Sequence, residues 1–215
     1  MSIPVIAPYA LPQDPIANRV SWTPDPKRAV LLVHDMQAYF LNKFDTTQAP
    51  VPQLVANART LRDACDAAGV PVFYTAQPTE QPAGDRALLN DFWGPGLTQP
   101  QFHAEQPVVD ELAPRAHDTV LTKWRYSAFQ RSDLAERMKA LGRDQLIVCG
   151  IYAHIGCMAT ALEAFMRDIQ PFLVIDAVAD FSLAEHEMAV NYVSRRCGAS
   201  LTLAQVQASL QAVTA

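Results

Sequence analysis

Residues 28–35 read RAVLLVHD, a short apolar run that ends in an aspartate. The apolar residues 29–33 follow one another without polar alternation, which is typical of a strand covered on both faces. A carboxylate directly after such a strand is costly to bury unless it is paired or protonated. The run therefore predicts a central strand of a buried sheet, with Asp35 at its carboxyl end.

Strands and helices alternate along the rest of the chain. Apolar residues recur at helical spacing over 53–68, Gly69 ends that helix, and a strand follows at 70–75. The same patterns predict strands at 118–121, 145–149, 172–175 and 200–203, and helices at 132–141 (with Ser132 as its N-cap), 157–168, 183–195 and 204–212. This order predicts an α/β fold with a mostly parallel sheet, whose ligand lies beyond the carboxyl ends of the strands.

Proline divides the chain into two parts. Fifteen of the sixteen prolines lie at or before Pro114, and six of them fall in residues 1–26. We expect residues 1–26 to form an extended arm packed on the domain, and residues 27–215 to form the domain itself. The long segment 76–116 is rich in proline and glycine, and loops of this length are usually functional.

Composition excludes several classes of protein. The 215 residues carry a formal net charge of −5 and are 50% hydrophobic and 18% charged, which argues against disorder and against nucleic acid or an anionic membrane as the main partner. No apolar run approaches the ~18 residues of a membrane span, and the first residues lack the form of a signal peptide. The four scattered cysteines form no CxxC pair, so we expect a cytoplasmic protein without a disulfide framework.

Three reactive side chains follow three of the predicted strands. Asp35 follows the first, Lys123 the third, and Cys157 lies where the fourth meets a helix. Together they would make a nucleophilic site, and a helix N-terminus would favour the thiolate. Each also has a structural reading: a turn or N-cap acid, a solvated lysine and a small buried hydrophobe. Position favours a functional reading for Asp35 and Lys123 and leaves Cys157 undecided.

The segment 123–129, KWRYSAF, places two cations among three aromatic rings. Such a mixture is typical of a pocket wall for an anionic ligand that carries a ring. Trp93 is a second candidate wall, or else a plain loop anchor. His34 and His154 lack the spacing of a metal motif, and no phosphate-binding glycine motif occurs, so we expect no metal and no nucleotide cofactor.

Long segments of the chain resemble the isochorismatase-like hydrolase superfamily. They are LLVHDMQAYF (31–40), YTAQP (74–78), DRALLNDFWGPGLT (85–98), LTKWRYSAF (121–129), GIYAHIGCMATALEAFMRDIQPF (150–172) and DAVADFS (176–182). More narrowly, the chain resembles the isochorismatase domain of catecholate-siderophore 2,3-dihydro-2,3-dihydroxybenzoate synthases, and phenazine-pathway enzymes share much of the pattern. The resemblance implies a three-layer α/β/α sandwich with a six-stranded parallel sheet, a Rossmann-like arrangement.

The resemblance also implies a reaction and a site. The reaction is hydrolysis of the vinyl ether of isochorismate to pyruvate and 2,3-dihydro-2,3-dihydroxybenzoate, in siderophore biosynthesis, with no metal or organic cofactor. Asp35 matches the family's proton donor, and we expect Lys123 to share the catalytic role. The expected substrate-binding residues are Gln77, Arg86 (on a substrate carboxylate), Trp93, Tyr126, Tyr152 and the backbone of Gly156. The family often has a non-proline cis peptide in the turn 150–152, and we expect one here.

Other readings stay open at this point. One is phenazine-type hydrolysis of 2-amino-2-deoxyisochorismate. Another is a metal-independent cysteine amidohydrolase that uses Asp35, Lys123 and Cys157, although nicotinamidases carry a metal-binding Asp and His where this chain has AQPT (76–79). Vinyl ether hydrolysis needs no nucleophile, so under that reading Cys157 is vestigial. A scaffold that only binds partners is a third reading, which the intact set of site residues disfavours.

The resemblance carries expectations about partners as well. Many siderophore isochorismatases continue into an aryl carrier domain, whereas this sequence stops at Ala215. We therefore expect a separate aryl carrier protein or aryl-activating enzyme as a partner, together with a homodimer or a larger homo-oligomer.

Overall fold

Six parallel strands form the centre of the computed structural model, which describes residues 3–212. Their order across the sheet is β3-β2-β1-β4-β5-β6, so the direction of winding reverses between β1 and β4. The strands are β1 (Ala29–His34), β2 (Val72–Ala76), β3 (Thr119–Thr122), β4 (Gln145–Ile151), β5 (Gln170–Ala179) and β6 (Ala199–Leu201). The prediction of an α/β fold around a six-stranded parallel sheet is confirmed.

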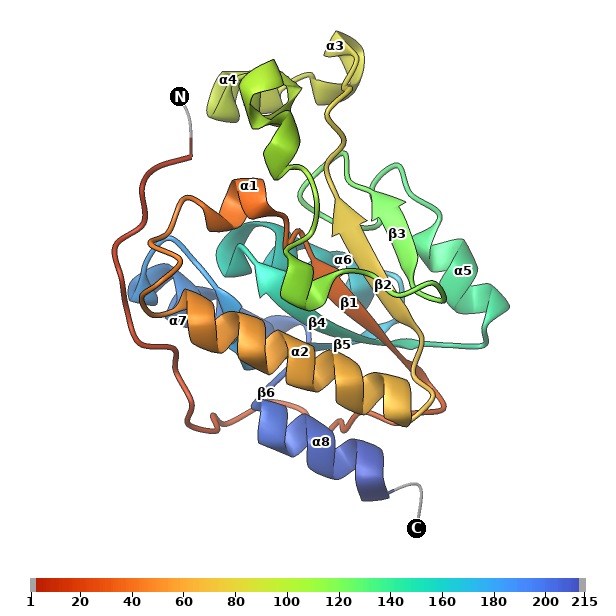
Figure 1. The fold of residues 1–215 in the computed structure, drawn as a ribbon. Coiled ribbons are helices and arrows are strands. Elements are labelled where there is room, and N and C mark those ends of the chain that lie inside the picture. The colour runs from red at the N-terminus through yellow and green to blue at the C-terminus, as the bar shows by residue number, and fades with distance from the viewer. Residues whose placement is uncertain (1–2, 213–215) are drawn as a thin grey trace.

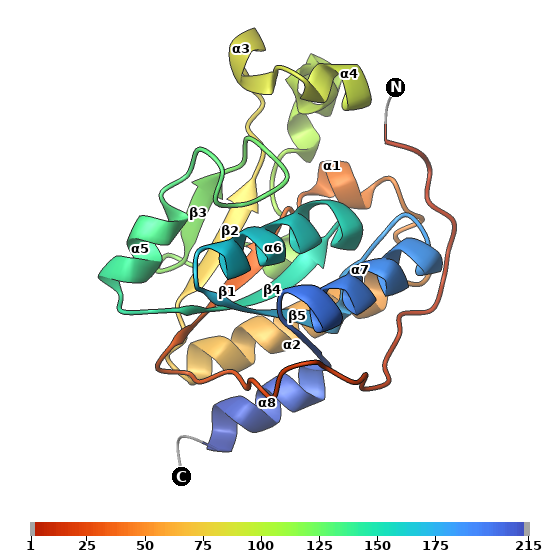
Figure 2. The same cartoon turned by 180° about the vertical axis from the view of Figure 1, so that it is seen from behind.

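Helices cover both faces of the sheet (Figures 1 and 2). Helices α2 (Val51–Ala67) and α8 (Leu203–Ala212) lie on one face, and α5 (Leu134–Ala140), α6 (Met158–Met166) and α7 (Leu183–Arg196) lie on the other. All of β1 is buried: Leu31 and Val33 belong to the core under α2, while Val30 and Leu32 belong to the core under α6. The apolar run therefore lacks alternation because each face of the strand has its own core.

The expected elements are present, with differences at their ends. Strand β5 has ten residues rather than four, because the half-buried Asp176 interrupts the apolar pattern inside a continuous strand. Helix α6 starts at Met158, after a π-helical turn over Ala153–Cys157, and not at Cys157. The N-cap of α5 is Asp133 and not Ser132, whose hydroxyl donates to the carbonyl oxygen of Ala128.

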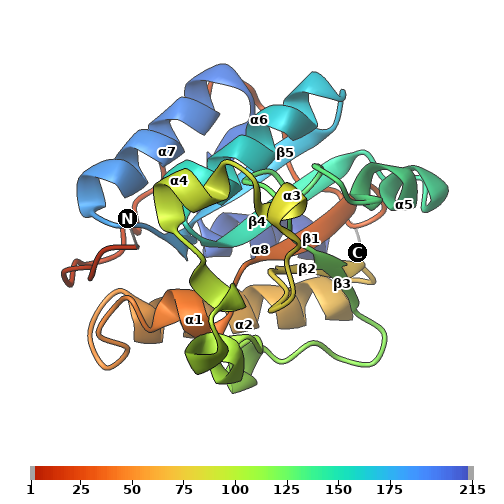
Figure 3. The same cartoon turned by 90° about the horizontal axis from the view of Figure 1, so that it is seen from above.

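The segment after β2 lies over the carboxyl ends of the strands (Figure 3). It forms two short helices, α3 (Ala83–Arg86) and α4 (Leu89–Trp93), followed by 3-10 turns at Gly96–Thr98, Pro100–Glu105 and Asp110–Leu112. Helix α1 (Ala38–Leu41) follows β1 at the same end of the molecule. The fold thus brings this segment over the sheet edge where Asp35 and Lys123 lie.

Residues 3–28 form no helix and no strand, apart from an isolated bridge between Ile6 and Phe44. They run along the edge of the molecule past α7 (Figure 2). Asn18 is bonded to Ser200 of β6 through its side-chain oxygen and nitrogen. Within the described residues, no helix is both long and apolar enough to cross a membrane.

Candidate active site

Side chains from the ends of β1, β2 and β3 form one buried polar cluster. Lys123 Nζ lies 2.9 Å from Asp35 Oδ2, and the Thr75 hydroxyl donates to Asp35 Oδ1 at 2.5 Å. The backbone N–H of Asp35 donates in turn to the Thr75 hydroxyl at 3.1 Å. Asp35 adopts a φ of 49°, in the left-handed region that aspartate tolerates better than most residues. Because β2 lies between β1 and β3, Lys123 reaches Asp35 across the end of Thr75's strand.

Asp35 is an ionised carboxylate in this arrangement. Burial raises its pKa, but the neighbouring His34, the charge of Lys123 and the hydrogen bonds from Thr75 and Lys123 together hold that pKa below its ordinary value. Burial lowers the pKa of the neighbouring His34 to about 4, so His34 is neutral near pH 7. Lys123 is therefore the cation that holds Asp35 in its charged form.

His34 connects Asp35 to the turn after β4. Its Nδ1 lies 2.8 Å from the carbonyl oxygen of Ile151, and its Nε2 lies 3.3 Å from that of Tyr126. A neutral imidazole has one N–H, and the shorter distance places it on Nδ1. The ring lies directly against Gly156, where a Cβ atom would be 2.1 Å from His34 Cε1. The expected non-proline cis peptide is present at Ile151–Tyr152.

Arg86 is a buried cation at the end of α3. It is 5% exposed, and its side chain donates to the carbonyl oxygen of Gly94 and to the side-chain oxygen of Gln81. Within residues 3–212, no carboxylate lies within ion-pair distance of Arg86. A buried guanidinium without an anionic partner is costly, and an anionic ligand would remove that cost.

Arg125 is a further cation of the pocket, and with Lys123 it makes up the two cations of the predicted pocket wall over residues 123–129. It lines the same pocket as Arg86 and Lys123. Its Nη1 donates to the carbonyl oxygen of Asp85, which ties the turn that carries Arg86 to the loop after β3. The pocket lining thus holds three cations and one carboxylate, an excess of two positive charges.

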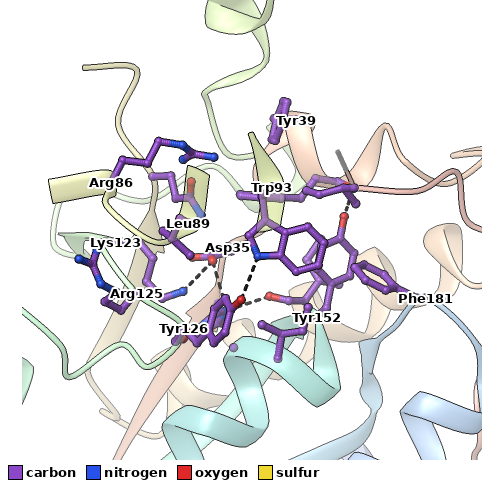
Figure 4. Close-up of a pocket in the computed structure, with 17 residues that line it drawn as sticks. Asp35, Tyr39, Arg86, Leu89, Trp93, Lys123, Arg125, Tyr126, Tyr152 and Phe181 are labelled. Atoms are coloured by element: carbon purple, nitrogen blue, oxygen red, sulfur yellow. Dashed lines mark hydrogen bonds and ion pairs between the residues drawn. The ribbon is translucent and has the colours of Figure 1, made fainter. Parts of the chain in front are cut away.

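Aromatic side chains form the opposite side of the pocket (Figure 4). The indole N–H of Trp93 donates to the Tyr126 hydroxyl at 2.9 Å. Tyr152 donates to the carbonyl oxygen of Phe40 at 2.8 Å, and its ring lies 4.6 Å from that of Phe181, centroid to centroid. Phe181 also contacts Trp93 at 6.1 Å. Figure 4 shows Arg86, Lys123 and Arg125 grouped on one side, and Trp93, Tyr152 and Phe181 on the other.

The structure places the predicted catalytic and binding residues in one pocket. The pocket is lined by Asp35 and Lys123 and by all the predicted substrate-binding residues, which are Gln77, Arg86, Trp93, Tyr126, Tyr152 and Gly156. The backbone of Gln77 is fixed by the buried Gln37, whose side chain accepts from its N–H at 2.7 Å and donates to its carbonyl oxygen at 2.9 Å. The backbone of Gln77 is therefore held in place at the lining of the pocket.

Two readings of Cys157 were open, a helix-activated thiolate and a small buried side chain, and its surroundings favour the second. It is fully buried and is not among the residues that line the pocket. Burial raises the pKa of its thiol well above the ordinary value, so the thiol is protonated. Desolvation outweighs any effect of the helix N-terminus here, and the arrangement offers no thiolate nucleophile to a ligand.

Several residues of the site lay outside the sequence-based set. Thr75 holds Asp35, Phe181 completes the aromatic side, and Ile3, Tyr39 and Leu89 also line the pocket. Thr75 could have been predicted from the sequence, because it places a hydroxyl at the end of a buried strand. Tyr39, Leu89 and Phe181 lie within the segments that carry the resemblance, but no periodicity singles them out there, and Ile3 lies outside those segments.

The pocket is suited to a ligand with both anionic groups and a ring. Its cationic side complements a dianion, and its aromatic side complements a ring. Asp35 is positioned to hold or release a proton at the junction of the two sides, because Lys123 controls its charge.

Comparisons with known proteins identify a family model and several relatives that are similar to this chain. The chain matches the model of the isochorismatase domain over residues 29–205. It is 57% identical over 199 residues to the isochorismatase of Bacillus subtilis (strain 168) and 55% identical over 200 residues to enterobactin synthase component B of Escherichia coli (strain K12). These alignments cover 92% of this chain, but only 63% and 70% of the two relatives.

A phenazine protein and two solved structures are also similar. The chain is 51% identical over 211 residues to phenazine biosynthesis protein PhzD1 of Pseudomonas aeruginosa, covering 95% of this chain and 98% of that protein. An isochorismatase family protein from Burkholderia thailandensis superposes with a TM-score of 0.75 at 26% identity, over 88% of this chain and 98% of that one. A cysteine hydrolase from Pseudomonas syringae shares the fold, with a TM-score of 0.77 at 22% identity over 99% of both chains.

Proposed function

The chain belongs to the isochorismatase family of hydrolases, and on that basis we propose that it hydrolyses the vinyl ether of isochorismate. The products are pyruvate and 2,3-dihydro-2,3-dihydroxybenzoate. The observation that carries this proposal is the buried Arg86, which has no carboxylate partner in the described part of the chain and lies in the same pocket as the Asp35–Lys123 pair. A substrate with two carboxylates would neutralise the excess positive charge of that pocket.

Substrate binding would convert Asp35 into an acid. In the free enzyme Lys123 holds Asp35 ionised. A substrate carboxylate or the ether oxygen competes for Lys123, and the loss of that contact leaves burial as the main influence on Asp35. Burial favours the protonated form, so Asp35 takes up a proton as the anionic substrate enters.

The reaction then needs one proton, one water and no nucleophilic residue. Asp35 donates its proton to the terminal methylene carbon of the vinyl ether, which becomes a methyl group beside an oxocarbenium ion. The Asp35 carboxylate stabilises that cation. Water adds to the cationic carbon and returns a proton to Asp35, and the hemiketal collapses to pyruvate and the ring alcohol. Arg86 would hold a substrate carboxylate by its planar fork, while Trp93 and Tyr152 would contact the ring.

Pyruvate release tests the proposal directly. Purified protein is mixed with isochorismate, and pyruvate is followed with a coupled lactate dehydrogenase assay. We expect rapid release by the unmodified protein and loss of most turnover, with retained substrate binding, in Asp35→Asn. Asp144→Asn is the matched control, because Asp144 pairs with Arg28 at the surface and does not line the pocket. Full activity of Asp35→Asn would remove the proton-donor role, and no release by the unmodified protein would reject the reaction.

The 2-amino counterpart of isochorismate is the second candidate substrate. Its support is the 51% identity to the phenazine protein over 95% of this chain. The slightly higher identity to the isochorismatase and to the enterobactin synthase component favours isochorismate and a role in siderophore biosynthesis. Comparison of kcat/KM for the two substrates decides between them, with the larger value expected for isochorismate.

The same proposal covers the cellular location, the partners and the oligomeric state of the enzyme. All four cysteines are buried and unpaired in the structure, which supports a reducing cytoplasm. The Escherichia coli relative is, by its name, one component of a synthase, which supports a separate aryl carrier or aryl-activating partner for this chain. We also propose a homodimer or a larger homo-oligomer, which light scattering after size-exclusion chromatography would measure.

A further inference from the structure

The Tyr9 hydroxyl joins the N-terminal segment to the end of β5. It accepts a hydrogen bond from the backbone N–H of Asp180 at 2.7 Å and lies 3.1 Å from Nδ1 of His186. Nε2 of His186 lies 2.9 Å from the carbonyl oxygen of Ile175, so Nε2 carries the ring proton and Nδ1 accepts. Tyr9 therefore donates to His186 and accepts from Asp180. Burial raises the pKa of Tyr9 and lowers that of His186, which keeps both groups neutral.

Asp180 extends this chain of bonds to the wall of the pocket. Its side chain is fully buried. Oδ1 accepts from the backbone N–H of Phe181 at 2.8 Å, and Oδ2 accepts from the backbone N–H of His154 at 2.5 Å. The ring of His154 also contacts Asp180, with Nδ1 at 2.5 Å from Oδ1. Asp180 thus fixes both the residue that completes the aromatic side and the π-helical turn that contains Gly156.

The same N-terminal segment reaches the pocket itself. Ile3 is one of the residues that line it. The backbone N–H of Ile6 donates to the carbonyl oxygen of Lys43 at 2.8 Å, which holds the segment between Ile3 and Tyr9 against the domain. Residues 3–9 therefore lie beside the binding site at one end and support its aromatic wall at the other.

We propose that Tyr9 is a positioning residue of the active site, which fixes Phe181 through Asp180 so that its ring can bind the ring of the substrate. This inference rests on the proposed function for the identity of the substrate. None of the bonds between Asp35, Lys123 and Thr75 involves the N-terminal segment. Loss of the Tyr9 hydroxyl should therefore weaken substrate binding and leave the proton donor intact, so the effect falls on KM.

Asn18→Ala supplies the matched control for Tyr9→Phe. Asn18 holds the same segment through two bonds to Ser200, donating to its carbonyl oxygen at 2.9 Å and accepting from its N–H at 2.7 Å. Each variant leaves one part-buried backbone N–H without its acceptor. A purely structural role of the Tyr9 hydroxyl predicts the same kinetics for both variants. A positioning role predicts a change in Tyr9→Phe alone, because Tyr9, unlike Asn18, is bonded to the strand end that leads into the pocket wall.

Steady-state kinetics with isochorismate separate the two roles. We expect Tyr9→Phe to raise KM about fivefold with kcat within about twofold of the unmodified enzyme, and Asn18→Ala to leave both constants within about twofold. Phe181→Ala should raise KM further, and Tyr9→Phe added to it should have no additional effect. An unchanged KM in Tyr9→Phe, equal effects of Tyr9→Phe and Asn18→Ala, or additive effects with Phe181→Ala would overturn the proposal.

Amide exchange tests the same relay without a substrate. The N–H groups of His154 and Phe181 are bonded to the Asp180 carboxylate, and their exchange is measured by NMR in the whole protein. We expect at least about tenfold faster exchange of both in Tyr9→Phe and no change in Asn18→Ala. Unchanged exchange in Tyr9→Phe would overturn the proposed path from Tyr9 through Asp180 to Phe181. If the unmodified protein releases no pyruvate, the proposed function fails, and the exchange result still decides whether Tyr9 positions Phe181.

Discussion

A methyl group added at Gly156 would enter the space of the His34 ring. The Cβ of an alanine there would lie 2.1 Å from Cε1 and 2.7 Å from Nε2 of His34. His34 is fully buried and bonded to the carbonyl oxygen of Ile151, so its ring cannot move aside without breaking that bond. Overpacking costs about 1–3 kcal/mol, and the lost buried hydrogen bond adds about 1 kcal/mol. We therefore expect Gly156→Ala to lower the free energy of unfolding by about 2–4 kcal/mol.

Urea denaturation of four variants measures this effect. Gly84→Ala is the control, because no atom beyond its chain neighbours and the backbone of its own helix lies within 4 Å of the Cβ that it adds. The other variants are Gly156→Ala, His34→Ala, which removes the ring that the new methyl group would meet, and the combination of the two. We expect the double variant to be more stable than the sum of the two single effects predicts. If Gly156→Ala is as stable as Gly84→Ala, or if the two single effects simply add, the steric reasoning is wrong.

The remaining predictions concern the pocket and its pH dependence. Arg86→Lys should raise KM about tenfold with a smaller change in kcat, because a lysine lacks the planar fork that binds a carboxylate bidentately. Initial rates over a range of substrate concentrations measure KM, and an unchanged value would contradict the contact between Arg86 and a substrate carboxylate. Cys157→Ala should keep kcat within about twofold in the pyruvate assay, since a buried, protonated thiol offers no nucleophile, whereas a collapse in rate would favour acyl chemistry. The lowered pKa of His34, about 4, means that the unfolded chain binds a proton below pH ~6.5 that the folded protein excludes. Stability should therefore fall by about 3 kcal/mol between pH ~6.5 and pH ~4, and His34→Gln should lose less over that range in denaturation experiments.

The sequence predicted the fold because its signals are local. The unbroken apolar run 29–33, the helical spacing before Gly69 and the alternation of elements each depend on neighbours along the chain. Asp35 and Lys123 could be predicted as site residues for a similar reason. Parallel strands bring their carboxyl ends to one edge of the sheet, so a reactive residue after a strand can be placed without coordinates.

The rest of the site depends on contacts between distant segments. Phe181 becomes part of the pocket only because its ring packs on Tyr152 and Trp93. The sequence left two readings of Cys157 open, because depth of burial, which raises the pKa of its thiol, is not visible in the sequence. Arg86 was predicted as a substrate-binding residue through the resemblance. That it has no carboxylate partner among residues 3–212 can be seen only in the structure, where those carboxylates have positions.

The bonds of the N-terminal segment also bear on the order in which the protein becomes functional during synthesis. Tyr9 meets Asp180 and Asn18 meets Ser200, so residues made first on the ribosome have to wait for partners made more than 170 positions later. Until those partners emerge, the segment lacks the bonds of Tyr9 and Asn18, and the aromatic wall has no support from Tyr9. Contacts this distant in sequence form late in folding. A nascent chain that has already built β1, β2 and β3 would thus hold its acid and its lysine before it can hold a substrate, and turnover would begin only after Asp180 and the residues around it have been made.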